Sequence, residues 1–288
     1  MENAEREVAA DPRSFLGVGA GLRLEHERGI FETSHHIDWF ELISENFMDY
    51  GGKPRRAIAN LKGKYPLVCH GLGLSLGSCE DVPPDYCEAL RELLDFTEAR
   101  WFSDHLCISS SLKHHYHDLL PILKTEDSLE KTIHKIRWIQ RFFDRPFAIE
   151  NITYYGESRH HTMEESEFIT RLLAETSCYL LLDINNVYVN EKNLGHKAKA
   201  FLTRLPSDRV IQIHLAGHEQ RQDFVIDTHG SAVCEEVWEL YEWYLKEAGR
   251  PINTLIEWDN NLPPFETLDA QVVRAKGVLE KLFPGVSS

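Results

Sequence analysis

The sequence predicts an α/β protein of the (β/α)8 TIM-barrel class. Eight short apolar runs alternate with longer amphipathic stretches along most of the chain. The apolar runs are nearly continuous, as is typical of parallel strands that are buried on both faces. Side chains suited to metal binding or acid–base chemistry stand at the end of every run after the first. Together these observations predict a closed barrel with a functional site at one end.

The expected strands share a run of apolar residues that is bounded by polar or turn-forming residues. The segment RVIQIHLAGHEQRQDFVIDTHG (209–230) shows the pattern, because Val210, Ile211 and Ile213 form the run and His214 closes it. The expected strands cover residues 15–23, 39–44, 66–75, 100–109, 146–153, 179–190, 210–218 and 253–259.

Helices are expected between these runs, where apolar residues recur at intervals of three and four. Residues 83–99 begin with two prolines and place Leu90, Leu93 and Leu94 near a 3.6-residue spacing. The same spacing occurs in residues 125–143, 164–175, 234–249 and 271–283. An open, doubly wound sheet requires about the same elements, so their order alone leaves both folds open. The segment GVGAG (17–21) lacks the spacing of a dinucleotide-binding loop.

Length and charge restrict the classes of protein to which this chain can belong. The 288 residues suit one large domain, and we expect a flexible tail over residues 1–14 and a single catalytic barrel over residues 15–283. There are 46 acidic and 31 basic residues, which gives a formal net charge of −15. Phosphate backbones and anionic lipids would repel such a chain, so neither nucleic acid nor a membrane is an expected partner.

The sequence indicates a cytoplasmic protein. Its apolar runs fall short of the roughly 20 residues that a membrane span needs, and its polar first residues do not resemble a signal peptide. The six cysteines are scattered and form no C-x-x-C pair, which argues against a zinc ribbon or a thioredoxin-like site. We expect most of them to be buried thiols in a reducing compartment.

Polar residues gather at one predicted end of the barrel. In (β/α)8 barrels the active-site residues lie at the C-terminal ends of the strands and in the loops that follow. The residues that the sequence places there are Glu45, Asn46, His70, Asp104, His105, Glu150, Asn151, Asp183, Asn185, Asn186, His214, His218, Asp227, His229, Glu257 and Asp259.

This combination of side chains is typical of a metal centre. Carboxylates and imidazoles crowded together without water are costly unless a cation compensates them. Their number exceeds the four ligands of one zinc ion and indicates two or three metals, and the N and O donors favour iron or manganese, then zinc. The candidate ligands are His70, His105, Glu150, Asp183, His214, Asp227, His229 and Glu257. Asn186 and His218 would suit a third metal, but side chains that only orient the ligands would stand in the same places.

Each of these residues also has an ordinary structural interpretation. A histidine at the end of a strand is often a hydrogen-bonded core residue, and Glu150, Asp183 or Glu257 would serve equally as a helix cap or as the partner of an arginine. The segment HHYH (114–117) is expected in a loop after the fourth strand, and a solvated loop is favoured over a role in substrate contact. The metal hypothesis therefore depends on how many such residues meet at one end.

The same residues lie in an ordered set of motifs that resembles the multinuclear non-haem iron-dependent oxidative enzymes (MNIO). The motifs are HGLGLSLGS (70–78), SDHL (103–106), ENITYY (150–155), LLLDINNVYVN (180–190), IHLAGH (213–218), IDTHG (226–230) and IEWD (256–259). They span nearly the whole chain. The resemblance implies a xylose-isomerase-like TIM barrel that holds two or three iron ions in mixed Fe(II)/Fe(III) states, with the eight candidate ligands named above.

The resemblance also implies a function. Characterised members of this family use dioxygen to modify cysteine residues of ribosomally synthesised precursor peptides, commonly beside a separate protein that recognises the peptide. We therefore expect a cysteine-containing precursor peptide as the substrate and a separate peptide-recognition protein as a partner. A sugar isomerase or phosphoester hydrolase that uses manganese, magnesium or zinc is the alternative enzyme. A metal-binding barrel without catalytic activity is the third hypothesis.

Overall fold

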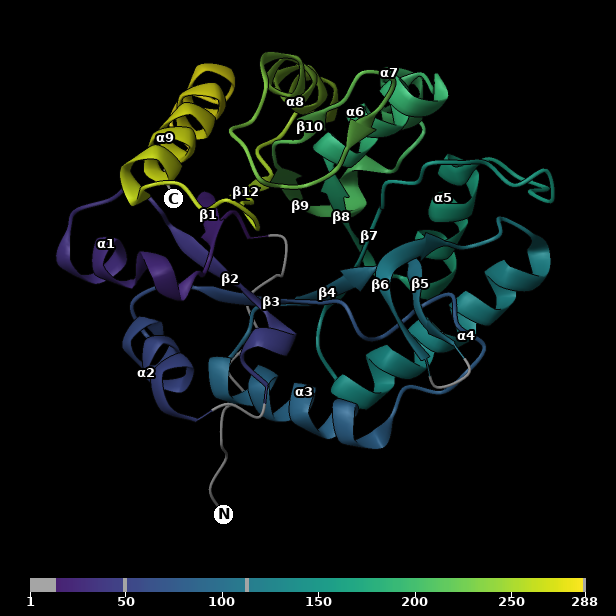
Figure 1. Ribbon diagram of the computed structural model, residues 1–288, viewed down its shortest axis with the longest axis horizontal. Coiled ribbons are helices and arrows are strands. Elements are labelled where there is room, and N and C mark those ends of the chain that lie inside the picture. The colour runs from purple at the N-terminus through teal and green to yellow at the C-terminus, as the bar shows by residue number, and fades with distance from the viewer. Residues whose placement is uncertain (1–13, 49–50, 112–113, 287–288) are drawn as a thin grey trace.

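Eight parallel strands close into a barrel in the computed structural model, which describes residues 14–48, 51–111 and 114–286 (Figure 1). The barrel strands are β1 (Val18–Gly21), β2 (Trp39–Ile43), β3 (Leu67–Gly71), β4 (Phe102–His105), β7 (Phe147–Glu150), β8 (Tyr179–Asp183), β9 (Val210–Leu215) and β12 (Asn253–Ile256). Strand β1 pairs with both β12 and β2, which closes the sheet. The predicted TIM barrel is confirmed, and the open doubly wound sheet is excluded.

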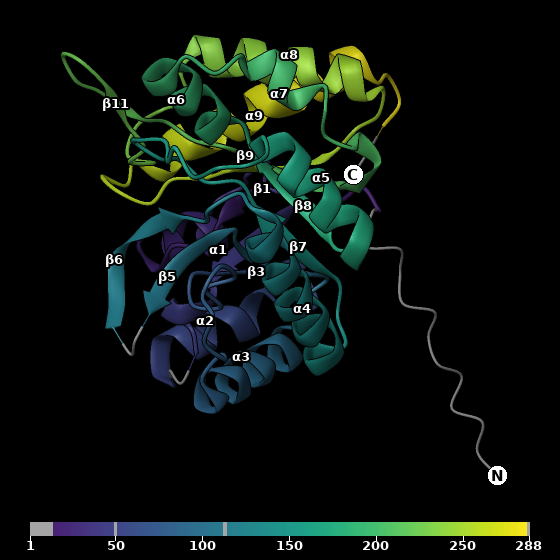
Figure 2. The same ribbon diagram turned by 90° about the vertical axis from the view of Figure 1, so that its right-hand side faces the viewer.

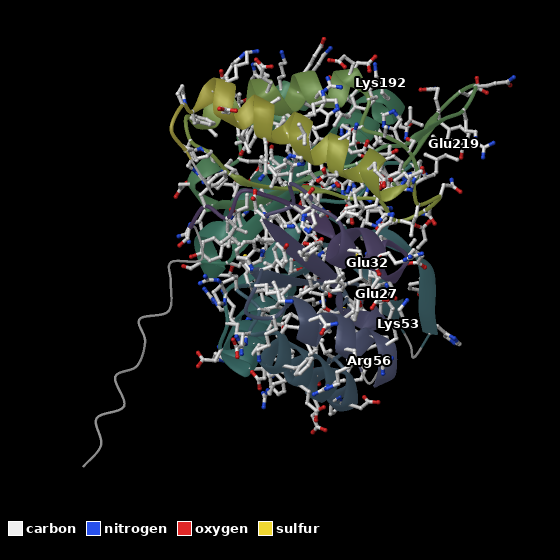
Figure 3. The ribbon with its side chains drawn as sticks, turned by 90° about the vertical axis from the view of Figure 1, so that its left-hand side faces the viewer. Glu27, Glu32, Lys53, Arg56, Lys192 and Glu219 are labelled. Atoms are coloured by element: carbon white, nitrogen blue, oxygen red, sulfur yellow. The ribbon has the colours of Figure 1, made fainter. Side chains whose placement is uncertain are left out.

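Helices follow each barrel strand and cover the outside of the barrel. They are α1 (Glu27–Glu32), α2 (Gly52–Leu61), α3 (Pro84–Thr97), α4 (Glu126–Phe143), α5 (Glu165–Thr176), α6 (Ile184–Leu194), α7 (Ala198–Leu202), α8 (Glu235–Ala248) and α9 (Phe265–Leu282), with 3-10 turns η1 (Leu24–His26), η2 (Ser44–Asn46) and η3 (Ser207–Arg209). Ion pairs tie neighbouring helices together at the surface: Lys53 Nζ of α2 lies 2.9 Å from Glu27 Oε2 of α1 (Figure 3). None of the helices in the described ranges is long and apolar enough to cross a bilayer.

The expected strand over residues 179–190 is wrong beyond Asp183, because residues 184–194 form helix α6. The Asp183 carboxylate caps this helix by accepting a hydrogen bond from the Asn186 backbone N–H at 2.6 Å. The following apolar residues are buried on both sides of a short helix, so their pattern alone does not distinguish helix from strand.

The expected fourth strand is also divided. Residues 102–105 belong to the barrel as β4, whereas β5 (Cys107–Ser111) leaves it and pairs with the antiparallel strand β6 (His114–Pro121). The segment HHYH (114–117), expected in a loop, therefore lies in strand β6. Figure 2 shows this hairpin on the same side of the barrel as the segment with β10 (Glu219–Gln220) and β11 (Val225–Ile226). Both excursions follow the C-terminal end of a barrel strand, so they rise around the mouth of the barrel. The expected tail over residues 1–14 lies, apart from Ser14, outside the described residues.

Large apolar side chains fill the barrel at the N-terminal ends of its strands. This floor consists of Trp39, Val68, Trp101, Ala148, Leu181, Ile211 and Leu255. Gly19 makes room for it, because a Cβ atom on Gly19 would lie 2.4 Å from the ring of Trp39. The floor leaves the side chains of the next layer, nearer the C-terminal ends, to form a site in the mouth.

Candidate metal centre

The ends of the barrel strands bring histidine and carboxylate side chains together above the apolar floor. His70 ends β3, His105 ends β4, Glu150 ends β7 and His214 lies near the end of β9. Seven of the eight predicted ligands are joined into overlapping groups, in which one ligand atom from each member lies within 4.8 Å of the others. The first group is His70, His105 and Glu150, the second is Glu150, Asp183, His214 and Glu257, and the third is His229, Glu257 and Asp259.

The first group directs two imidazole nitrogens at one carboxylate oxygen. Nε2 of His70 lies 3.0 Å from Glu150 Oε2, and Nε2 of His105 lies 3.1 Å from the same oxygen. The opposite ring nitrogens are engaged elsewhere: Nδ1 of His70 is 2.8 Å from Ser103 Oγ, and Nδ1 of His105 is 3.1 Å from the Gly71 carbonyl oxygen. Since a carbonyl only accepts, Nδ1 of His105 carries the proton, and its Nε2 is left with a lone pair.

The second group surrounds His214, whose side chain is fully buried. Its Nδ1 lies 2.9 Å from Glu257 Oε2 and 3.3 Å from Glu150 Oε1. The other oxygen of Glu150 belongs to the first group, so this one carboxylate lies between the two groups. A bridging position of this kind is what a centre with more than one metal requires.

The third group extends the cluster to the loop after β9. Nδ1 of His229 lies 3.0 Å from Glu257 Oε2, and its Nε2 lies 2.8 Å from Asp227 Oδ1 and 3.7 Å from Asp183 Oδ2. The backbone of His229 has φ of 44°, a left-handed conformation that is strained for a non-glycine residue. Its carbonyl accepts a hydrogen bond from the Asp259 N–H at 2.8 Å, which fixes this conformation against the loop after β12.

A metal cluster would satisfy polar atoms that the protein leaves without partners. Six buried side-chain atoms of this site have no hydrogen-bond partner among the described residues, although several lie within ion-pair distance of one another. These atoms are Glu150 Oε2, Asp183 Oδ2, Asn186 Oδ1, His214 Nδ1, His229 Nε2 and Glu257 Oε2. Unpaired buried polar atoms are costly, and convergent lone pairs without hydrogen-bond geometry fit cations placed between them.

The electrostatics of the cluster lead to the same conclusion. Burial disfavours a charge on His70, but the Glu150 carboxylate outweighs burial and raises the pKa of His70 to about 9. The pKa of His214 is likewise raised well above its ordinary value, against the effect of burial, by the carboxylates around it. Burial raises the pKa of Asp183 well above its ordinary value, and the neighbouring carboxylates add to the effect. Without a metal, protons on imidazoles must balance these carboxylates; a metal cation would replace them.

Two buried residues beneath His214 were not among the residues predicted from the sequence. Glu41 lies in the middle of β2, and its Oε1 is 3.1 Å from Nε2 of His214. Gln212 of β9 donates from Nε2 to Glu41 Oε2 at 2.6 Å and accepts from the Trp101 indole N–H at 2.8 Å. A carboxylate that holds the Nε2 proton leaves Nδ1 of His214 free to bind a metal. Both residues are polar interruptions of apolar strands, and that was the available signal.

Asn186 and His218 occupy different positions. The Asn186 side chain donates to the Asn151 carbonyl at 3.0 Å and has its Oδ1 buried beside the cluster. His218 lies further out, where its Nδ1 is 2.8 Å from Asn185 Oδ1 and its ring stacks on Tyr188 with centroids 5.1 Å apart. Since the Asn185 amide donates to Asp227 Oδ1 at 2.9 Å, His218 reaches the cluster through two other side chains.

Two further strand-end carboxylates support the loop after His70. Glu45 Oε1 accepts from the Leu72 N–H at 2.8 Å and from the Tyr86 hydroxyl at 2.6 Å. Asp104 Oδ2 accepts from the Leu74 N–H at 3.0 Å. These bonds hold the segment whose Gly71 carbonyl orients His105.

The remaining strand-end residues lie around the cluster. Asn151 pairs with the backbone N–H and carbonyl of Asp183 at 2.9 Å each. Asp259 contacts both His229 and Arg23. Asn46 is exposed.

Comparison with protein families identifies relatives over nearly the whole chain. Residues 17–280 match the family model described as RiPP precursor modification enzyme MbnB/TglH/ChrH, where RiPP denotes a ribosomally synthesised and post-translationally modified peptide. A UPF0276 protein from Acaryochloris marina is 41% identical over 259 residues, which cover 90% of this chain and 93% of the relative. A UPF0276 protein from Caulobacter vibrioides is 40% identical over 267 residues, covering 91% and 94%.

Solved structures share the fold at low sequence identity. The apo form of 3-keto-D-glucoside 4-epimerase from E. coli superposes with a TM-score of 0.59 at 14% identity, covering 91% of this chain and 99% of that one. A xylose isomerase domain protein from Planctomyces limnophilus has a TM-score of 0.59 at 10% identity, covering 93% and 98%. These similarities confirm a xylose-isomerase-like barrel and concern the fold alone.

Proposed function

Because this chain belongs to the MbnB/TglH/ChrH family of RiPP precursor modification enzymes, we propose that it is a multinuclear iron-dependent oxidase that uses dioxygen to modify cysteine residues of a precursor peptide. The observation that supports this proposal most strongly is the cluster of convergent, buried ligand atoms without partners at the mouth of the barrel. Nitrogen and oxygen donors of this kind suit iron.

The proposed ligands are the eight histidines and carboxylates that the sequence singles out. They are His70, His105, Glu150, Asp183, His214, Asp227, His229 and Glu257. Bound iron would supply Lewis acidity toward a substrate thiol and redox chemistry with dioxygen. We assign His218 to the orientation of Asp227, on the contacts described above, whereas Asn186, whose buried Oδ1 has no hydrogen-bond partner among the described residues, is proposed as a further ligand of a third metal.

The protein supplies no thiol ligand of its own to the proposed metal centre, so a thiol of the substrate would have no competitor there. None of the metal-binding groups found among the described residues contains a cysteine. Burial raises the pKa of the Cys69 thiol to about 12, so that this side chain stays protonated and does not compete for a metal. The apolar floor and the buried carboxylates exclude bulk water from below, which strengthens electrostatic interactions at the mouth.

We further propose that a separate protein presents the precursor peptide to this barrel. The support for this step is the resemblance to the MNIO family, whose members commonly act beside such a partner.

The proposal is tested with protein purified without oxygen. We expect the wild type to contain more than one iron per chain and to consume dioxygen when a cysteine-containing precursor peptide is added, with a change in the peptide's mass. His105→Ala and Asp227→Ala should lower the iron content and abolish the mass change, because each removes a ligand. His36→Ala is the control, since His36 is an exposed imidazole that pairs with Asp269.

Full peptide modification by both ligand variants would refute the assignment of the site. Activity toward a sugar or a phosphoester with manganese, magnesium or zinc, without dioxygen, would favour the alternative enzyme. Tight iron binding without any oxygen consumption in the presence of the peptide would favour a non-catalytic barrel.

A further inference from the structure

A cavity of about 820 Å³ opens beside the metal centre, between the β5–β6 hairpin and the first half of α3. Its apolar lining includes Met48, Leu72, Ala89, Tyr116 and Leu119. Leu72 and Tyr116 are 38% and 41% exposed, so this apolar lining is accessible from solvent. The cavity therefore presents apolar surface to anything that approaches the mouth from this side.

The wall of this cavity is the same loop that orients the metal-site histidines. Leu72 and Gly73 line the cavity, and Gly71, directly before them, accepts from His105. The loop packs so closely that a Cβ atom on Gly73 would lie 2.5 Å from the ring of Tyr86. A molecule in the cavity would therefore rest against the segment that leads from His70 into the metal centre.

The charged residues of the lining are all acidic. Glu45, Asp85 and Asp118 line the cavity without a lysine, arginine or histidine among the lining residues that the structure describes. Three other cavities of the described part of the chain include lysine residues, such as Lys124 and Lys135. Glu45 also has its Oε2 shielded from solvent and without a hydrogen-bond partner among the described residues. A carboxylate oxygen in this state favours a cationic donor.

The hairpin that borders the cavity offers backbone groups as well. Strands β5 and β6 form a two-stranded sheet, so within the described residues each strand pairs on one side only. An extended chain that lies along such an edge gains main-chain hydrogen bonds, and neighbouring pockets select its alternate side chains. This arrangement suits a peptide better than a small polar molecule such as a sugar.

We propose that this cavity binds the stretch of precursor peptide next to the modified residue and selects a segment in which lysine or arginine lies close to a large apolar side chain. The apolar side chain packs against Leu72, Ala89 and Leu119, and the cationic group pairs with Glu45, Asp85 or Asp118. This inference rests on the proposed function for the identity of the peptide as a substrate, but the binding preference itself requires neither iron nor dioxygen.

The test measures peptide binding separately from chemistry. Three fluorescein-labelled decapeptides, each with serine in place of cysteine, contain apolar and basic residues, apolar and acidic residues, or polar and basic residues. Fluorescence anisotropy gives their affinities for the wild type before and after removal of metal. The apolar and basic peptide should bind about tenfold or more tightly than the other two in both states, because it alone matches the apolar wall and the carboxylates.

Two kinds of variant then locate the binding site. Ala89→Trp fills the cavity. A triple variant with E45Q, D85N and D118N removes the negative charge of the cavity, and its E45Q substitution keeps an oxygen for the Leu72 N–H. The Ala89→Trp variant and the triple variant should each bind the apolar and basic peptide about tenfold more weakly than the wild type. Ala200→Trp on α7, which lines a different cavity, is the matched control and should leave the affinity unchanged. Circular dichroism verifies that the variants are folded.

Equal binding of the three peptides, or unchanged binding by folded Ala89→Trp, would overturn the inference. Affinity that falls equally in Ala89→Trp and Ala200→Trp would overturn it as well, because the loss would then not be specific to this cavity. Cysteine modification without a preference for basic neighbours would leave the proposed function intact and refute the cavity's role. Selective binding of the apolar and basic peptide by a protein without oxygen-dependent activity would support the cavity's role and refute the proposed function.

Discussion

Replacing Glu41 with glutamine tests how the barrel interior supports the proposed metal centre. Glu41 Oε1 lies 3.1 Å from His214 Nε2, and Glu41 Oε2 accepts from Gln212 Nε2 at 2.6 Å. The carboxylate thus accepts from Gln212 and, when His214 carries a proton on Nε2, from His214 as well. The amide of a glutamine has one oxygen, so either His214 or Gln212 must face an N–H group instead of an acceptor.

The expected loss of metal affinity follows from this geometry. Substitution of a group that orients a metal-binding histidine costs about 10- to 100-fold in metal affinity. Because Glu41→Gln removes both a negative charge and an acceptor beneath the fully buried His214, we expect the upper part of this range, about 100-fold or about 2.7 kcal/mol. The metal bound to His214 should be the one that is lost first.

Ferrous iron titration against a competing chelator, without oxygen, measures this effect. The matched control is Asp269→Asn, which changes another carboxylate–imidazole pair, Asp269 Oδ2 and His36 Nδ1 at 2.8 Å, on the surface. The control should retain the wild-type affinity. A folded Glu41→Gln protein with wild-type iron affinity and stoichiometry would show that His214 needs no such support, and the reasoning would be refuted.

Three further predictions concern packing, protons and the metal. Gly19→Ala should lower the free energy of unfolding, measured in urea, by about 1–3 kcal/mol, because its Cβ would meet Trp39. Gly277→Ala, on the exposed face of α9 with open space around it, should raise the free energy of unfolding by about 0.5–1 kcal/mol. Equal effects of the two substitutions would contradict the packing argument. Metal binding at pH 7.5 should release protons to a pH indicator, because Glu150 outweighs burial and keeps the pKa of His70 near 9 in the metal-free protein, and the release should fade above pH 9. Removal of metal by a chelator should lower the Tm in calorimetry, since the cluster then loses its compensating cations; an unchanged Tm would argue against tight metal binding in the native state.

The barrel and the convergence of the candidate ligands could be predicted because both follow from patterns along the chain. Parallel strands buried on both faces read as apolar runs, and barrel geometry gathers their C-terminal ends. His70, Glu150 and His214 lie at those ends, so their convergence followed from the fold. The contacts between them did not, because the side-chain directions depend on strand register and on the loops that follow.

Glu41 and Gln212 show where a single sequence is insufficient. Each lies inside a strand, where its role depends on which face points into the barrel and on which strand stands opposite. The β5–β6 hairpin was not predicted for a related reason. Strand β6 is rich in histidine and other polar residues, so it has no apolar run, and pairing with β5 stabilises it instead. Helix α6 was misread because residues 184–190 are all buried, so apolar residues occur on more than one side of the helix and show no helical spacing.

The tightly packed tryptophans and aliphatic side chains at the N-terminal end of the barrel close that end, so the interior above them is open only at the mouth. If the proposed function holds, dioxygen, peptide and product would all use the mouth of the barrel, and a long polypeptide would enter and leave on the same side. A residue in a segment able to bend sharply, or one near a chain terminus, would approach the cluster above this floor most easily. Product would then have to dissociate before the next substrate binds, and we expect product release to be the rate-limiting step of turnover.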